Sequence, residues 1–206
     1  MNPAESKRQF GELQQRMRAC RACLEAGHQV TPPAVTQGNI GARIMTIGQA
    51  PGVTEVKAKR PFNAGSGTRL FQWLAAAGID ENWFRSTQYM TAVTKCFPGK
   101  ASSGGGDRVP SAKERALCRP FLDAELALVQ PALIIPIGRL AIELFFPQKG
   151  SLEELIGTEN LKEGRWIVPL PHPSGASRWH QIAENKVRID QAIGLIANHY
   201  RELFID

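Results

Sequence analysis

The sequence lacks any long apolar segment. Its 206 residues contain no run that approaches the roughly 20 apolar residues needed to span a bilayer. The N-terminal stretch MNPAESKRQF also lacks the charged-then-apolar pattern of a signal peptide. Internal repeats and linker-like stretches are missing too, so we expect a single domain over residues 1–206. These absences predict a soluble, cytoplasmic protein that does not act at a membrane. We also expect it to be a monomer.

Acidic residues are scarce in the first part of the chain. The net charge is +6, but residues 1–119 carry 17 Lys and Arg against 8 Asp and Glu, whereas residues 120–206 carry 8 against 11. A local basic surplus favours binding to a polyanion, because it releases condensed counterions. The same surplus is also typical of a solubilising surface, and charge alone leaves both interpretations open.

Apolar runs of strand length alternate with segments of helical spacing. The runs cover 43–48, 89–93, 133–138 and 166–171, and helical patterns cover 67–77, 111–129 and 139–145. This alternation predicts an α/β fold, a three-layer α/β/α sandwich with a central four-stranded parallel sheet. Ligands of such sheets bind beyond the carboxyl ends of the strands, so we expect function in the loops that follow the four runs.

Cysteines are few, and the four present need one explanation. Cys20 and Cys23 form a C-x2-C pair, followed far along the chain by Cys96 and Cys118. The expected cellular location argues against disulfides, and four thiolates suit tetrahedral zinc and an iron-sulfur cluster equally on spacing. A thioredoxin-like redox pair is disfavoured because C-x2-C lies in an Arg-rich, helix-like segment before any strand.

Five motifs occur in a recognisable order: IGQAPG, RPF, YMTAVTKC, CRPFLDAELALVQPALIIPIGRLA and PHPS. Together they cover roughly residues 15–195, and the series resembles the iron-sulfur branch of the uracil-DNA glycosylase superfamily, often called family four. The resemblance implies a structural [4Fe-4S] cluster held by Cys20, Cys23, Cys96 and Cys118. It also implies that the partner is DNA containing uracil or abasic sites, which would place the protein at the nucleoid.

The resemblance assigns the parts of a base pocket. A glycosylase must extrude its target nucleotide and stabilise the charges that develop as the base leaves. Phe62 matches the aromatic residue that stacks on uracil, and His172 matches the histidine that hydrogen-bonds a uracil oxygen as negative charge builds up. Residues Gly48, Gln49 and Ala50 match the motif that wraps the base and places water.

The sequence departs from the family pattern at two positions. Gln49 stands where the family usually has glutamate, so Glu55 becomes the candidate for guiding water or stabilising the cationic sugar. Ala92 stands where the family has an asparagine that reads the uracil edge. That polar edge would then need Gln49, a backbone group or Thr91, because a buried polar group left unpaired costs about 1 to 3 kcal/mol.

Two loops are candidates for DNA contacts. Ser66, Gly67 and Thr68 open a predicted helix whose free N–H groups could bind a phosphate, although a plain helix cap would look the same. In the loop after His172, Ser174 and Ser177 could hold phosphates, and Arg178 and Trp179 could fill the vacated stack. Packing of Trp179 beneath the loop is the alternative. Lys95 completes the predicted DNA contacts.

The sequence thus predicts a monofunctional uracil-DNA glycosylase, a hydrolase of base excision repair that leaves an abasic site. No lysine aligns as a Schiff-base nucleophile, so strand cleavage is not expected. The alternatives are a glycosylase for another deaminated base, a protein that holds uracil or abasic DNA with weak turnover, and an iron-sulfur redox protein.

Overall fold

The computed structural model describes residues 2–102, 104, 106–146, 150–175 and 179–205. Its strands are β1 (Ile44–Gly48), β2 (Tyr89–Ala92), β3 (Leu133–Pro136), β4 (Asn160–Lys162) and β5 (Arg165–Ile167). Its helices are α1 (Pro3–Ala19), α2 (Ala22–Glu25), α3 (Val53–Ala58), α4 (Gly65–Ala76), α5 (Glu81–Thr87), α6 (Ala112–Val129), α7 (Arg139–Ile142), α8 (Leu152–Leu155), the 3-10 turn η1 (Trp179–Gln181) and α9 (Ala183–Phe204).

A single sheet organises the molecule, with strand order β2-β1-β3-β5-β4. β1 pairs in parallel with β2 and with β3, and β3 pairs in parallel with β5. Because these strands share one direction, their carboxyl ends and the loops that follow lie along one edge of the sheet.

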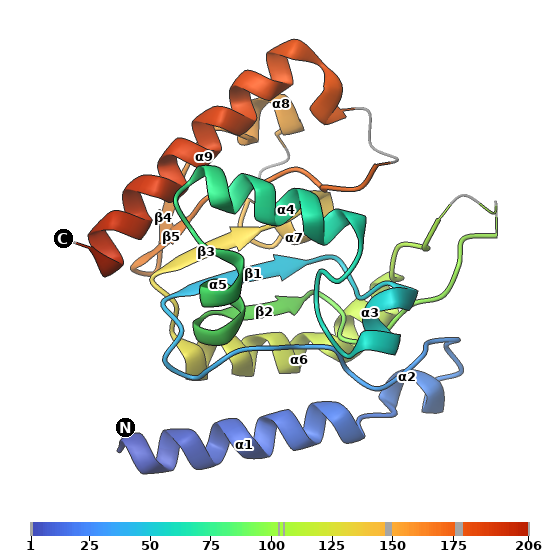
Figure 1. The fold of residues 1–206 in the computed structure, drawn as a ribbon. Coiled ribbons are helices and arrows are strands. Elements are labelled where there is room, and N and C mark those ends of the chain that lie inside the picture. The colour runs from blue at the N-terminus through green and yellow to red at the C-terminus, as the bar shows by residue number, and fades with distance from the viewer. Residues whose placement is uncertain (1, 103, 105, 147–149, 176–178, 206) are drawn as a thin grey trace.

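Helices cover both faces of the sheet. Figure 1 shows α4, α5 and α9 on one side of the strands and α6 with α1 on the other. Every residue of β1 is buried, because Ile44 packs under α4 and α9 while Met45 and Ile47 pack under α6. A strand covered on both faces reads as a continuous apolar run, which is why the sequence pattern located β1 correctly. The predicted α/β/α architecture is confirmed.

The predicted strand count is wrong. The sheet has one strand more than predicted. This additional strand, β4, pairs antiparallel with β5 through a tight turn at Glu163 and Gly164, both of which have positive φ. Two of its three residues, Asn160 and Leu161, are exposed, so β4 produces neither an apolar run nor an alternating pattern. β5 is also shorter than predicted, although Leu170 still forms an isolated parallel bridge to Ile137.

The longest predicted helix is confirmed as α6. Ser111 is its N-cap and accepts from the N–H of Glu114, whose carboxylate accepts in return from the N–H of Ser111. This capping box fixes where the helix begins. Across the described part of the chain, no helix has the length and apolar character needed to cross a membrane.

Candidate functional site

The loops after β1, β2 and β3 and the segment after β5 surround a cavity of about 40 Å³. Its lining includes every residue predicted to bind or act on the base. The lining residues are Val35, Gly48, Gln49, Ala50, Pro51, Glu55, Pro61, Phe62, Ser66, Thr91, Ala92, Ile137 and His172. Residues separated by more than 100 positions in the sequence thus meet in one small site.

His172 enters the cavity as a neutral hydrogen-bond donor. The backbone N–H of Ser174 donates to Nδ1 of His172 at 3.2 Å. An N–H can only donate, so Nδ1 is an acceptor and the ring proton resides on Nε2. The residue is reachable from solvent, but the protein atoms around its ring disfavour the charged form and lower its pKa.

Phe62 forms one wall of the cavity. A Cβ placed on Gly48 would lie 3.2 Å from the end of the Phe62 ring. The aromatic ring therefore sits directly against the backbone at the end of β1, where a larger residue would crowd it. This contact is a physical reason for glycine at the start of the GQAPG loop.

Glu55 holds two segments of the wall together. Its Oε2 accepts from the N–H of Gly52, and its Oε1 accepts from the N–H of Phe62. Burial raises the pKa of the Glu55 carboxyl, and the two backbone donors partly oppose that rise. Each carboxylate oxygen can accept a further hydrogen bond, so this clamp leaves Glu55 able to bind a ligand or a water.

The floor of the cavity is formed by β1 and β2, and Gly48 pairs there with Ala92. The Thr91 hydroxyl is hydrogen-bonded to both oxygens of the buried Glu125, at 3.0 and 3.1 Å. Thr91 is therefore present in the lining, but its hydroxyl is already engaged with α6. For the Gln49 side-chain amide, no hydrogen bond is found among the described residues.

The prediction that Lys95 contacts DNA is not supported by its placement. Lys95 is only 2% exposed, and its Nζ lies 2.7 Å from Oε2 of Glu125, which is fully buried. Nζ also donates to the carbonyl of Ala92. Because its ammonium forms a buried ion pair with Glu125, Lys95 links the end of β2 to α6 and is not placed to bind a phosphate.

The helix after Phe62 begins without a side-chain cap. Its N-cap residue is Ala64, and Ser66 and Thr68 lie in the first turn, so the capping alternative for them is not what the structure has. Ser66 lines the cavity, whereas Thr68 is exposed. Gly67 is buried, and a Cβ there would lie 1.8 Å from the carbonyl oxygen of Phe62. Close packing against the Phe62 backbone therefore explains why this position is a glycine.

Trp179 packs against the molecule in the way the alternative prediction described. Its Nε1 donates to Glu153 of α8, and its carbonyl accepts from the Asn185 side chain of α9. The ring also packs against the apolar cluster between α4, α9 and the sheet. Trp179 therefore anchors the end of the loop, and insertion into DNA would require it to leave these contacts. Ser177 and Arg178 lie outside the described residues.

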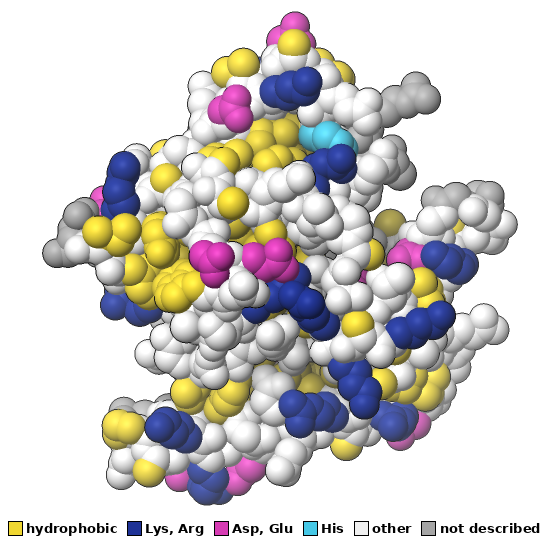
Figure 2. All heavy atoms as spheres, viewed as in Figure 1, with side chains coloured by type: hydrophobic (Ala, Val, Ile, Leu, Met, Phe, Trp, Pro, Cys, Tyr) yellow, Lys and Arg dark blue, Asp and Glu magenta, His cyan; other side chains and the backbone are white. Residues whose placement is uncertain are grey.

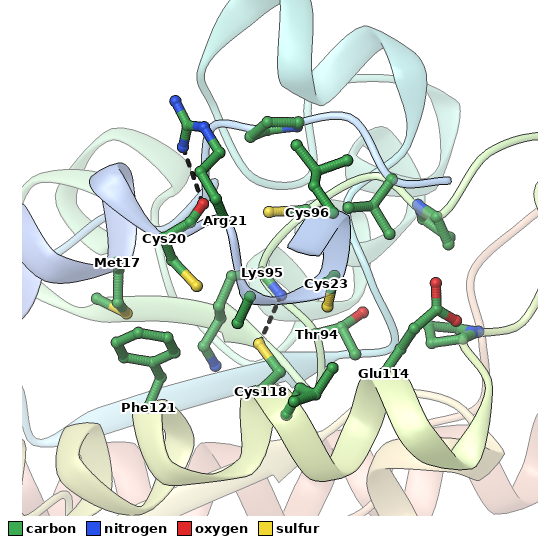
Figure 3. Close-up of a pocket in the computed structure, with 17 residues that line it drawn as sticks. Met17, Cys20, Arg21, Cys23, Thr94, Lys95, Cys96, Glu114, Cys118 and Phe121 are labelled. Atoms are coloured by element: carbon green, nitrogen blue, oxygen red, sulfur yellow. Dashed lines mark hydrogen bonds between the residues drawn. The ribbon is translucent and has the colours of Figure 1, made fainter. Parts of the chain in front are cut away.

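The four cysteines line a second cavity, of about 30 Å³. Figure 3 shows Cys20 and Cys23 from the α1–α2 segment, Cys96 from the loop after β2, and Cys118 from α6 around this space. Burial raises the pKa of Cys23 to about 11 and that of Cys96 to about 12. Thiols in such surroundings become thiolates when a metal supplies positive charge.

The arrangement of the thiols can be tested against the groups they could bind. Within the described residues, no three His, Cys, Asp or Glu side chains converge closely enough to hold one metal ion. Zinc would draw its thiolates onto a single centre through bonds of about 2.3 Å. Four cysteine thiols that line one cavity are the donor set of an iron-sulfur cluster and also that of a tetrahedral zinc site.

Two residues of the site were missed by sequence reasoning. Gly138 has φ 81°, and a Cβ there would lie 3.2 Å from the His172 side chain, so it lets the histidine approach β3. Its position in PIGRLA, at the end of a predicted strand, was the available signal. Arg85 bonds the segment behind Phe62, and no motif pointed to it.

Basic side chains gather near the cavity. Figure 2 shows Lys and Arg side chains around the region where Figure 1 places α2 and α3, and α3 lies between β1 and Phe62 in the chain. Lys57 and Lys59, at the end of α3, are exposed. Part of the basic surplus noted in the sequence therefore lies on α3, the helix that also carries the cavity residue Glu55.

A parallel α/β sheet with a ligand-sized cavity beyond its strand ends is the architecture of a class of enzymes and binding proteins, and a comparison with known families identifies which one. The family described as "Uracil DNA glycosylase superfamily" matches residues 35–193. The chain belongs to that superfamily.

The curated relatives narrow the class. A Type-4 uracil-DNA glycosylase of Thermotoga maritima is 30% identical over 79% of this chain and 80% of its own length. One of Sulfurisphaera tokodaii is 31% identical over 68% of this chain and 63% of that protein. One of Archaeoglobus fulgidus is 32% identical over 62% of this chain and 59% of that protein.

Proposed function

We propose that this protein is a monofunctional DNA glycosylase that removes uracil from DNA and leaves an abasic site. The observation that carries the proposal is the cavity at the strand ends, where a neutral histidine donor and an aromatic ring face the same small space. Relatives named Type-4 uracil-DNA glycosylase support the choice of base. Among the described lining residues there is no lysine, which supports hydrolysis without strand cleavage.

The base stacks on the Phe62 ring, next to the GQAPG backbone. Uracil extruded from the helix stacks on the Phe62 ring beside Gly48 and Ala50. As the bond between uracil N1 and sugar C1′ breaks, its electron pair stays with the base. The Nε2–H of His172 donates to the uracil oxygen on which negative charge accumulates, and because the donor is fixed in advance it costs little reorganisation.

Gln49 reads the polar edge of uracil in place of the missing asparagine. Ala92 has no polar atom in its side chain, and the Thr91 hydroxyl is already committed to Glu125. Gln49 and Thr91 were the two side chains considered for this edge. Of these two, and within the described residues, only the Gln49 side chain has polar atoms that make no hydrogen bond. An amide offers both a donor and an acceptor, which suits the imide edge of uracil.

Glu55 orients the water that attacks C1′. Its carboxylate is held at the wall by two backbone N–H groups and keeps lone pairs for a water. The oxygen of that water bonds to C1′ as the base leaves, and one water proton is released. The raised pKa of Glu55 favours taking that proton over an ordinary surface carboxylate. The negative charge also stabilises the cationic sugar.

The four cysteines hold a [4Fe-4S] cluster in the second cavity. Cys20 and Cys23 of the N-terminal segment, Cys96 of the loop after β2 and Cys118 of α6 would hold the cluster, which would link these three elements structurally. These three elements border the cavity floor through Lys95 and Ala92. Purified protein should be brown and contain iron, whereas a colourless protein with stoichiometric zinc would contradict this assignment.

Single-turnover kinetics on a panel of oligonucleotides tests the activity. The panel contains uracil and other deaminated bases in matched single-stranded and duplex forms, and alkali cleavage reports abasic sites. We expect abasic sites to form in the uracil substrates and no strand breaks before alkali treatment. Tight binding of uracil DNA without base release would instead identify a damage-binding protein, and faster release of another base would change the substrate.

A further inference from the structure

The segment that carries Phe62 has a backbone conformation that phenylalanine rarely adopts. Phe62 has φ 50°, in the left-handed region that side chains with a Cβ disfavour. Such a conformation persists only where the surrounding structure imposes it. The contacts behind the Phe62 ring therefore decide which way it faces.

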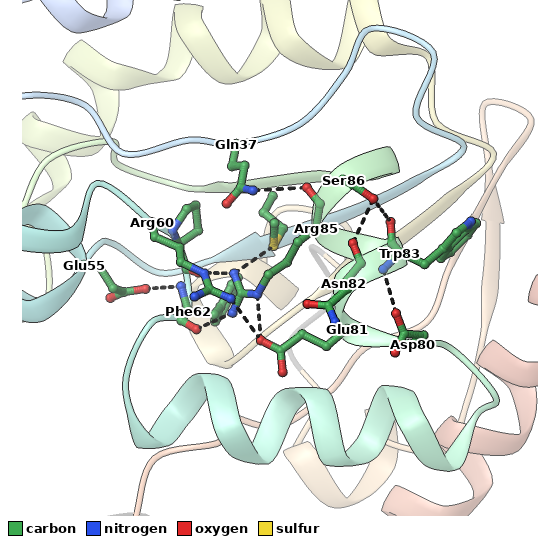
Figure 4. A network of polar contacts seen from close by, with 12 residues as sticks. Gln37, Glu55, Arg60, Phe62, Asp80, Glu81, Asn82, Trp83, Arg85 and Ser86 are labelled. Atoms are coloured by element: carbon green, nitrogen blue, oxygen red, sulfur yellow. Dashed lines mark hydrogen bonds and ion pairs between the residues drawn. The ribbon is translucent and has the colours of Figure 1, made fainter.

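Three hydrogen bonds impose this conformation. Nη1 of Arg85 donates to the carbonyl of Pro61 at 2.8 Å, and Nη2 donates to the carbonyl of Phe62 at 2.7 Å. The N–H of Phe62 donates to Glu55 on the opposite side. Figure 4 shows the Arg85 guanidinium and the Glu55 carboxylate approaching Phe62 from two directions.

Arg85 is itself fixed in place. It is 7% exposed, and its Nε donates to Glu81 at 2.7 Å. Its guanidinium carbon also lies 4.2 Å from the centre of the Phe71 ring, a distance typical of a cation–π contact. The planar fork of an arginine bonds two neighbouring carbonyls in a fixed geometry, whereas the ammonium of lysine is a point charge on a flexible stem.

We propose that Arg85 is a positioning residue for base removal. By bonding the carbonyls of Pro61 and Phe62, it fixes the aromatic face in the cavity before the substrate arrives. Arg85 is not among the described residues that line the cavity, so it acts through Phe62. The inference rests on the proposed function, because the partner of Phe62 is the extruded base.

A double-mutant cycle tests whether Arg85 acts through Phe62. Arg85→Met should lower the single-turnover rate of uracil release by about 10²-fold, the order of loss expected when a reacting group is misplaced by about 1 Å. In a Phe62→Ala background the same substitution should change the rate by less than about twofold, because no ring remains to be positioned. Fully additive losses would overturn the proposal.

Hydrogen exchange in the free protein supplies a readout that needs no substrate. Exchange over residues 60–68 should be faster in Arg85→Met than in the unaltered protein, because the turn loses two of its three hydrogen bonds. Unchanged exchange would overturn the proposal even if the rates fell. If the unaltered protein releases no uracil, the proposed function fails, and exchange still decides whether Arg85 holds Phe62.

Further variants test whether the effects of Arg85→Met are specific to the contact with Phe62. Glu81→Gln weakens the exposed anchor of Arg85 and also the ion pair between Arg60 and Glu81. It should shift rate and exchange in the same direction as Arg85→Met by a smaller factor, and it decides the matter if Arg85→Met does not fold, with Arg60→Met as the variant that removes the second pair alone. Arg165→Met is the control, since Arg165 also reaches a backbone carbonyl, that of Leu126, but at the other edge of the sheet. It should leave the rate and the exchange of residues 60–68 unchanged.

Discussion

Replacing His172 by alanine should slow the release of uracil without weakening DNA binding. His172 lines the cavity, and its ring donor is the Nε2–H, because Nδ1 accepts from the N–H of Ser174. Alanine removes that donor and leaves the negative charge on the departing uracil without its partner. Backbone and phosphate contacts, which dominate the affinity for DNA, are untouched.

The size of the effect follows from the kind of interaction lost. Removing one preorganised donor to a developing anion costs about 10² to 10³ in rate, or about 2.7 to 4 kcal/mol of transition-state stabilisation. His172→Gln should lose less than His172→Ala, because a glutamine amide also offers an N–H near the position of Nε2. The rate of uracil release should therefore be highest in the unaltered protein, lower in His172→Gln and lowest in His172→Ala.

The assay is a single-turnover reaction at saturating enzyme on a uracil oligonucleotide, with DNA affinity measured separately. His199→Gln is the matched control, because His199 is buried in α9 and pairs with Glu159, away from the cavity. It should lower the melting temperature without changing the rate of the folded protein. An unaltered rate in His172→Ala would show that the donor lies elsewhere, and equal losses in both histidine variants would point to stability.

Further outcomes are expected from pH and from four other positions. Since the pKa of His172 lies below its ordinary value of about 6.5, the rate should stay constant from pH 8 to about 6.5. Below that range it should fall, because Nδ1 takes up a proton and loses the bond from the Ser174 N–H, and because the Glu55 carboxylate also takes up a proton; a midpoint above 6.5 in single-turnover rates would refute this. Trp179→Ala should lower the melting temperature and reduce rates equally on duplex and single-stranded uracil; a loss confined to duplex would instead indicate wedging. Lys95→Met should destabilise folding by about 3 to 5 kcal/mol in urea unfolding, because it leaves a buried carboxylate unpaired, and DNA binding should keep its salt dependence; a reduced slope would return Lys95 to the DNA surface. Gln49→Ala should slow uracil release by about 10-fold or more, and Ala92→Asn should restore part of it; no loss would leave edge reading to the backbone.

The sequence determined the layers of the fold and the end of the sheet where the site forms. Strands buried on both faces must be continuously apolar, so β1 and β3 were visible as runs, and the spacing of Leu70, Phe71 and Leu74 marked α4. Parallel strands bring their following loops to one edge, so the order of the motifs already implied that Gly48 and His172 would meet.

Only the tertiary structure decided which of those polar groups are free. Lys95 is part of a basic cluster in the sequence, but its charge is consumed by Glu125, which α6 places beside it from 30 positions away. Trp179 follows the histidine loop, yet α8 and α9 supply partners that hold it against the core. Arg85 belongs to no motif, and its role arises because α5 packs behind the Phe62 turn. Hydrogen-bond partners of this kind depend on the packing of distant elements, which local spacing does not specify.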